Sequence, residues 1–266
     1  MNVVPHPEFV RLNNDCEVLQ EELLQLVVDI DALEATIIPN IEAEYQLAIG
    51  HLEYERFCVQ VEINKLKRTL EIIQASVNHG KIISQEQVDE ILKKEFKEWE
   101  DNLKEHLEKI ELAKMRKQSL LSFEESKEIQ KLYRKIAKKI HPDINPDMYH
   151  QHVVLWQRAV DAYKNGILDT LKALWVLVQD FQDETPQIFS GIETLKQKKE
   201  ELKDNIAKLL SRIPDIKSNH PYTLKEKLMN RSWVKEQKTT LEKSIADLSF
   251  RKMQLNMIAD QMFKEN

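Results

Sequence analysis

The feature that most constrains this fold is a set of apolar stripes with the spacing of a coiled coil. In the first stripe, apolar residues recur at alternating intervals of three and four along 16–37. This spacing places them on one face of a helix that packs against another helix. Further stripes of this kind lie within 41–77, 188–213 and 241–255. The first stripe consists of Cys16, Leu19, Leu23, Leu26, Ile30, Leu33 and Ile37.

Glycine and proline are scarce, with 4 and 8 copies in 266 residues. An all-β fold needs many tight turns, and a phosphate-binding loop needs glycines, so the composition argues against both. Glu, Lys, Leu, Ile and Gln dominate the chain, and these residues suit long helices. We find no segment with the pattern of a strand. The sequence therefore predicts an all-α fold.

Turn signals divide the chain into three expected domains. Pro39 disfavours helical geometry at Ile38, so we expect the first long helix to end there. Gly80 is suited to the end of the second helix, and the segment from Pro214 to Pro221 marks a later turn. The stripes leave open whether they pair within one chain or between the chains of a homodimer. The expected domains are an antiparallel coiled-coil hairpin at 1–80, a helical domain at 84–183 and a second antiparallel coiled-coil hairpin at 187–266.

Three residue pairs have the spacing of a helix capping box. In this arrangement a Ser or Thr at the start of a helix is followed three residues later by Gln or Glu, and each satisfies a backbone N–H group. Each pair therefore predicts where a helix begins. The pairs are Ser84 with Gln87, Ser122 with Glu125, and Thr223 with Glu226.

The two cysteines, Cys16 and Cys58, do not form a CxxC pair. They do not support a disulfide framework, and we expect a reducing compartment. The N-terminus lacks the basic start and apolar run of a secretory signal, and no segment approaches the roughly 18 uncharged apolar residues of a membrane span. We therefore expect a cytoplasmic protein without membrane contact.

Charge is unevenly distributed along the chain. Residues 1–60 hold 12 acidic and 2 basic side chains, whereas residues 114–140 hold 9 basic and 3 acidic ones. The net charge of the whole chain is −6. A basic segment within an acidic protein indicates a partner-binding surface more directly than the total charge does.

The basic segment leads into two helical patterns separated by His141-Pro142-Asp143. The first pattern places Ile129, Tyr133, Ile136, Ala137 and Ile140 on one face, as a core requires. The second places Val153, Trp156, Val160 and Tyr163 on one face. We expect these two helices to pack antiparallel and to display the His-Pro-Asp turn at the exposed tip. The opposite face of the first helix carries Lys127, Lys131, Arg134, Lys135 and Lys138.

The stretch 126–163 resembles the J-domain of the DnaJ family. The match comprises the basic run 133–139, the His-Pro-Asp motif at 141–143, Asn145-Pro146, and then Trp156, Ala159 and Ala162-Tyr163 at the family's core spacing. About 40 residues match well. The resemblance implies a co-chaperone that docks on a DnaK-class chaperone, stimulates its ATPase and holds an unknown client with its coiled-coil arms. The implied contact residues are His141, Pro142, Asp143, Asn145, Lys131, Arg134, Lys135 and Lys138.

Some residues depart from the family pattern. Ile144 stands where many J-domains have a basic residue, and no Tyr-x-x-Leu-Gly-Val first helix precedes the motif. The helix expected at 84–116 is a candidate replacement for that first helix. The glycine/phenylalanine-rich linker and the cysteine-rich zinc module are absent. The alternative interpretation is a structural coiled-coil scaffold whose J-like domain no longer couples to a chaperone.

Other functional classes find little support in the sequence. His141 and Asp143 lie one proline apart in a turn with no nucleophile beside them, so we expect no catalytic residues and no enzyme. His150 and His152 point to different helix faces, and we expect no metal site. No motif indicates a cofactor. Overall acidity argues against nucleic acid as a partner.

Overall fold

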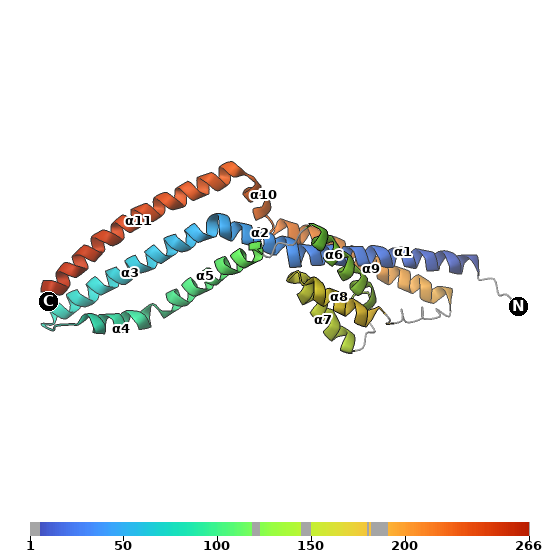
Figure 1. Cartoon of the computed structure of the whole chain (residues 1–266), viewed down its shortest axis with the longest axis horizontal. Helices are drawn as coiled ribbons and strands as arrows, with labels where there is room; N and C mark the ends of the chain where they lie inside the picture. The colour runs from blue at the N-terminus through green and yellow to red at the C-terminus, as the bar shows by residue number, and fades with distance from the viewer. Residues whose placement is uncertain (1–5, 119–122, 145–149, 180, 182–190, 266) are drawn as a thin grey trace. The chain divides into compact units, whose positions relative to one another are not determined.

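A computed structural model describes residues 6–118, 123–144, 150–179, 181 and 191–265. Every regular element within these ranges is helical, which confirms the predicted all-α class. The chain forms two compact units (Figure 1). Unit 1 contains residues 1–41 and 119–223, and unit 2 contains residues 42–118 and 224–266.

The first helical stretch passes through Pro39 without a turn. Helix α1 (Pro7–Ala32), the π-helical turn η1 (Leu33–Ile37), α2 (Ile38–Tyr45), the π-helical turn η2 (Gln46–Gly50) and α3 (His51–Asn78) follow one another directly. The expected break at Pro39 is therefore wrong. The Ile38 N–H donates to the Leu33 carbonyl, five residues back. This wider turn just before the proline gives its ring room that a regular α-helix lacks.

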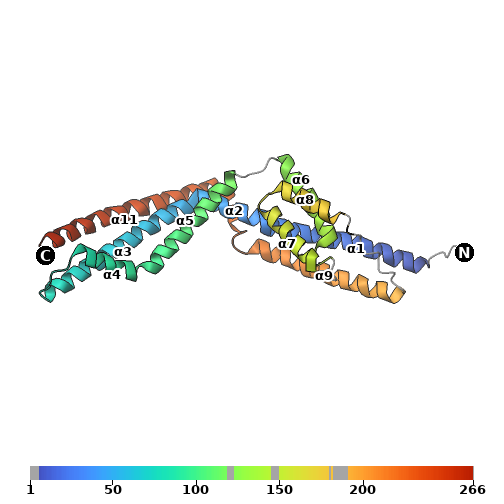
Figure 2. The ribbon, with the colours of Figure 1, turned by 60° about the horizontal axis from the view of Figure 1, so that its bottom comes forward.

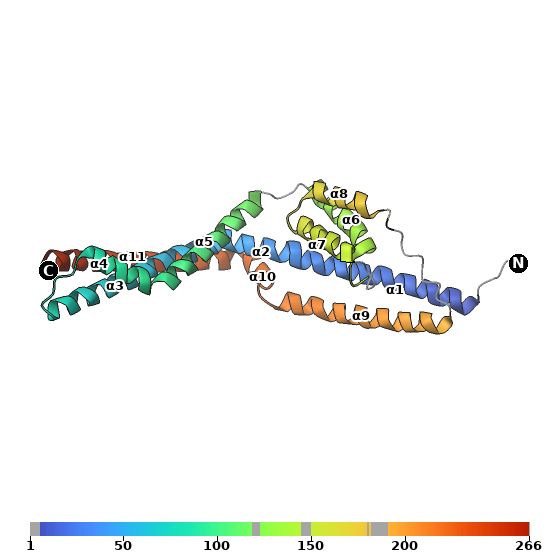
Figure 3. The same ribbon diagram turned by 90° about the horizontal axis from the view of Figure 1, so that it is seen from below.

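In unit 1, α1 pairs with α9 (Ile192–Ser218) (Figure 3). The two helices run parallel, because ion pairs join residues near both of their starts and residues near both of their ends. Glu8 Oε1 lies 3.3 Å from Lys196 Nζ, and Glu34 Oε1 lies 2.6 Å from Arg212 Nη2. Lys199, the one polar member of the α9 stripe, is 2.7 Å from Asp15 across the pair. The apolar core of the pair consists of Leu12, Cys16, Leu23, Leu195, Leu202 and Ile206.

Unit 1 also contains α6 (Phe123–Ile140), α7 (His150–Lys164) and α8 (Leu168–Val178), which pack on one another (Figure 2). Helix α6 also packs on α1, and α7 packs on η1. The turn between α7 and α8 is closed by Gly166, whose φ of 66° lies in the left-handed region. Leu24 and Val28 of α1 and Ala35 of η1 belong to the same apolar core. The residues that complete this core are Ile129, Tyr133, Ile136, Ala137, Ile140, Trp156, Ala159, Ala162, Tyr163, Leu171, Leu174 and Val178.

In unit 2, α3 packs against α11 (Arg231–Glu265) and against α4 (Gln85–Glu95) and α5 (Lys97–Gln118). The α3–α4 turn uses Gly80 at a φ of 63°, as predicted for the end of this helix. Lys65 Nζ is 2.7 Å from Glu100 Oε1, and Arg68 Nε is 2.8 Å from Glu95 Oε2. The later residue of α3 thus pairs with the earlier carboxylate, so α3 runs antiparallel to α4 and α5. The short helix α10 (Leu224–Met229) precedes α11.

The predicted pairing of the long helices is corrected by these contacts. The segment 1–80 is no hairpin, and α9 and α11 of the expected 187–266 hairpin belong to different units. Helices α4 and α5 pack on α3 and therefore do not supply the first helix of the domain expected at 84–183. The cause is the continuous helix through Pro39, since its two halves each accept a different C-terminal helix.

The capping boxes have three different outcomes. The Ser84–Gln87 box is confirmed, with both reciprocal bonds present. Ser122 lies outside the described residues. Thr223 precedes the short α10, and the last long helix begins later, where the Asn230 side chain accepts the N–H groups of Ser232 and Trp233 at 3.1 Å. None of the described helices combines the length and the apolarity needed to cross a membrane.

Candidate functional site

Helices α6 and α7 hold the His-Pro-Asp turn through a stack of aromatic rings. Tyr133 is fully buried and stacks on Tyr163, with ring centroids 4.1 Å apart. Eight residues after Tyr133, directly after the end of α6, the His141 ring meets the edge of Trp156, with ring centroids 4.5 Å apart. Later residues of α6 thus face earlier residues of α7, so the two helices run antiparallel as the spacing of their apolar faces predicts.

His141 is buried, with only 7% of its surface exposed. This corrects the expectation that the whole motif forms an exposed tip, because only Pro142 and Asp143 are exposed. The Asp143 N–H donates to His141 Nδ1 at 3.0 Å, and the Ile144 N–H donates to the His141 carbonyl at 3.1 Å. His141 is therefore the internal support of the turn, while Asp143 is presented to solvent.

Burial lowers the pKa of His141 to about 4, although the nearby Asp143 carboxylate acts in the opposite direction. The imidazole is consequently neutral at pH 7. A neutral ring accepts a hydrogen bond at one nitrogen and donates from the other. Since Nδ1 accepts from the turn, the proton belongs on Nε2, which lies 4.0 Å from Asp31 Oδ2.

Asp31 is the residue of this site that sequence reasoning missed. It comes from α1, more than 100 positions before His141, and its Oδ2 accepts a hydrogen bond from the Tyr133 hydroxyl at 2.8 Å. Burial raises the pKa of Asp31 to about 6, while the Tyr133 hydrogen bond acts to lower it. No local motif marks Asp31, but the acidic excess of 1–60 was the available signal.

The basic face of α6 divides into paired and solvent-exposed side chains. Arg134 bonds Glu21 and Gln25 of α1, and Lys138 Nζ is 3.6 Å from Glu21. The hydrogen bond from Arg134 lowers the pKa of Glu21. Sequence reasoning thus identified the basic residues but missed their acidic partner within the same chain.

Lys131 and Lys135 are the remaining members of the predicted basic set. Both are exposed. Lys135 Nζ lies 5.1 Å from the centre of the Trp175 ring, within cation–π range. Lys131 has no ion-pair or hydrogen-bond partner among the residues described in the structure. Asn145, the last predicted contact residue, lies outside the described residues, as does Pro146.

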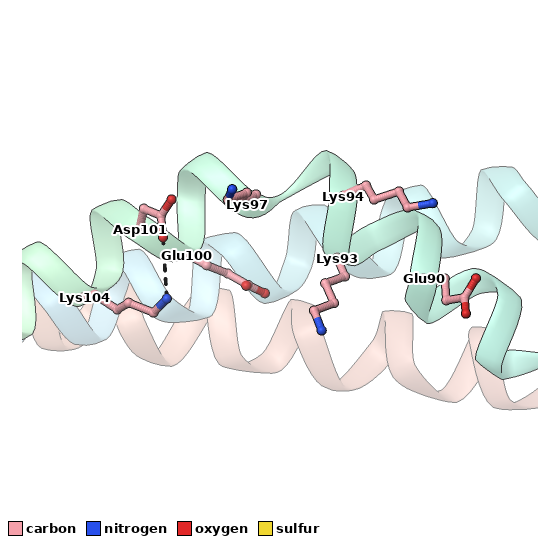
Figure 4. A pocket seen from close by; sticks show the side chains of 7 residues that line it. All are labelled: Glu90, Lys93, Lys94, Lys97, Glu100, Asp101 and Lys104. Carbon is pink, nitrogen blue, oxygen red and sulfur yellow. Dashed lines mark hydrogen bonds and ion pairs between the residues drawn. The ribbon is translucent and has the colours of Figure 1, made fainter.

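The surface also has a hollow between α4 and α5 in unit 2 (Figure 4). Some of its charges are paired, since Lys104 Nζ lies 3.5 Å from Asp101 Oδ1 and Lys65 Nζ of α3 lies 2.7 Å from Glu100 Oε1. Both ammonium and carboxylate groups line it, so neither an anion nor a cation is clearly favoured, and we assign no function to it. The lining residues are Glu90, Lys93, Lys94, Lys97, Glu100, Asp101 and Lys104.

The turn combines a buried histidine with an exposed carboxylate. His141 is neutral at pH 7, and Asp143 is exposed to solvent. Within the part of the chain that the structure describes, no group of three or more His, Cys, Asp or Glu side chains is placed to hold a metal ion. Comparison of the chain with protein-family models, curated proteins and solved structures found no match.

Proposed function

We propose that unit 1 docks on a DnaK-class chaperone through the Pro142-Asp143 turn and the exposed lysines of α6, and thereby stimulates the chaperone's ATPase. The observation that carries this proposal is the support of the turn by His141. A buried ring accepts the Asp143 N–H and leaves the Asp143 carboxylate in solvent. A carboxylate held in this way is pre-organised to pair with an arginine of a partner.

The lysines of α6 supply the second part of the proposed contact. Lys131, Lys135 and Lys138 are exposed on the helix that leads into the turn. An acidic surface on the chaperone would be attracted to them, and such peripheral charges mainly increase the association rate and orient transient complexes. The long helices paired with α1 and α3 are then available to hold a client protein.

The test measures ATP hydrolysis by a DnaK-class chaperone with and without the full chain. Asp143→Asn removes the exposed charge but keeps the shape of the side chain, and we expect stimulation to fall at least about tenfold. Asp161→Asn, a matched exposed carboxylate on α7, should leave stimulation unchanged. Equal stimulation by Asp143→Asn and the wild type would refute the proposal. His141→Gln should also abolish stimulation, and circular dichroism must then show that the helices are intact.

A structural scaffold remains the second candidate, and the contact between Glu21 and α6 favours it. Arg134 and Lys138, two of the predicted docking residues, are already engaged by this carboxylate. A scaffold with no chaperone coupling predicts no binding in either the ATP or the ADP state. Glu21→Gln separates the candidates, because it removes the carboxylate charge that pairs with both cations. If the chain docks on the chaperone, Glu21→Gln should increase its stimulation of ATP hydrolysis. An uncoupled scaffold should give no stimulation with or without this change.

A further inference from the structure

Helix α11 carries two apolar faces, of which only one is used within unit 2. The face toward α3 includes the buried Ala259, the half-buried Leu248 and Leu255, and Lys252, whose Nζ lies 2.5 Å from Glu62 of α3. These residues follow the heptad spacing expected of one helix packed against another. The stripe predicted along 241–255 is therefore the one that binds α3.

A second apolar stripe lies on the far side of the same helix. Ala246, Phe250, Met253 and Met257 each stand two positions before a residue of the α3 face, so they lie about 160° around the helix from it. All four are exposed, with Phe250 at 58%, Met253 at 51% and Met257 at 66%. Their spacing of four, three and four is again that of a coiled coil.

The surroundings of this stripe resemble an interface more than a solvated surface. Between Ala246 and Met257 the charged residues are Asp247, Arg251 and Lys252, a smaller share than the 32% of the whole chain. Apart from Asp247, the residues that flank the stripe on either side are polar and uncharged. Depletion of charge around exposed aromatic and methionine side chains is typical of the centre of a protein–protein contact. The uncharged flanking residues are Ser249, Gln254 and Asn256.

We propose that this second face of α11 binds the same face of another copy of the chain, with the two helices antiparallel. The charges at the ends of the stripe identify the occupant. Lys243 continues the stripe before Ala246, and Asp260 continues it after Met257, and both are exposed. When two copies are related by a twofold axis between positions 251 and 252, Phe250 faces Met253 and Lys243 faces Asp260, each pair occurring twice.

A parallel arrangement would instead place Lys243 against Lys243 and Asp260 against Asp260, which is unfavourable. The stripe from Ala246 to Met257 is only about 17 Å long. Eight side chains of this kind bury on the order of 800 Å², less than the roughly 1,600 Å² of a standard stable complex. The dimer is therefore a weak one, with a dissociation constant in the micromolar range.

Sedimentation velocity of the full chain between about 1 and 100 µM tests the dimer, since this range brackets a micromolar dissociation constant. Met257→Glu places one charge per chain in the apolar contact, and we expect the dissociation constant to rise at least about tenfold. Met229→Glu is the matched control, because Met229 is an equally exposed methionine outside the stripe, and it should leave the constant unchanged. A wild-type chain that is monomeric at about 100 µM, or a dimer insensitive to Met257→Glu, would overturn the proposal.

A charge exchange tests the antiparallel register independently. Lys243→Glu alone should weaken the dimer about three- to tenfold, since it sets two pairs of like charges in contact. Lys243→Glu combined with Asp260→Lys should return the dissociation constant to near the wild-type value. If the double variant dimerises no better than the single one, the register is wrong and another face or another protein covers the stripe. Circular dichroism checks that each variant stays helical.

Discussion

The buried carboxylate of Asp31 should make unit 1 less stable as the pH rises. Its pKa is about 6 in the folded protein, mainly because of burial, and about 3.9 in an unfolded chain. The folded state therefore binds more protons between pH 4 and 6, and its stability falls across this window. Asp31→Asn retains an oxygen that accepts the Tyr133 hydroxyl hydrogen bond but carries no charge.

The magnitude follows from the pKa difference of about two units. A single site of this kind loses about 2 kcal/mol of folding stability between pH 4.5 and 7.5. The Asp31 side chain is 25% exposed, which allows some solvent screening, so we expect about 1 to 2 kcal/mol. The folding stability of Asp31→Asn relative to the wild type should therefore be higher at pH 7.5 than at pH 4.5 by that amount. The depressed pKa of His141 has the opposite sign, because stability rises with pH from about 4 to 6.5. Above about pH 7.5 the imidazole is neutral in both the folded and the unfolded chain, so this contribution no longer changes there.

Urea denaturation followed by tryptophan fluorescence provides the measurement. Replacing Trp99 and Trp233 of unit 2 by Phe leaves Trp156 and Trp175 as reporters of unit 1. The control is Asp29→Asn, an exposed carboxylate on the same helix, whose effect should be small at both pH values. A stability difference between Asp31→Asn and the wild type that does not change with pH would refute the reasoning. So would a less stable variant at pH 7.5, since ionised Asp31 would then be favourably paired.

Two further predictions concern the helix turn at Gly80 and the two thiols. Gly80→Ala should destabilise unit 2 by about 1 kcal/mol, because Gly80 has a positive φ. Gly80→Asn should destabilise it less, since Asn tolerates this conformation. Thermal denaturation of the variants tests both expectations. Cys16 is 3% exposed and burial raises its pKa, so its labelling by a thiol reagent in the folded protein should be at least about a hundredfold slower than that of the half-buried Cys58. Equal labelling rates would contradict the packing of α1 on α9.

Local sequence features determined the helices and much of the proposed site. Periodicity of apolar residues predicted the all-α class, and the facing stripes of α6 and α7 predicted their antiparallel packing. The capping box at Ser84 and the glycine at Gly80 placed helix ends correctly. These features depend on residues within one or two helical turns of each other, so the sequence alone suffices to identify them.

Only the tertiary structure decided which helices pair and what surrounds the His-Pro-Asp turn. An apolar stripe can pack against any other apolar stripe, so its spacing does not name its partner or its direction. The π-helical turn before Pro39 keeps the helix continuous, contrary to the sequence signal. Helix α1 pairs with α9 in parallel, and its Asp31 lies beside Tyr133 and His141. Burial of His141 depends on this contact between distant segments, because desolvation comes from whatever packs on a side chain and not from its neighbours in sequence.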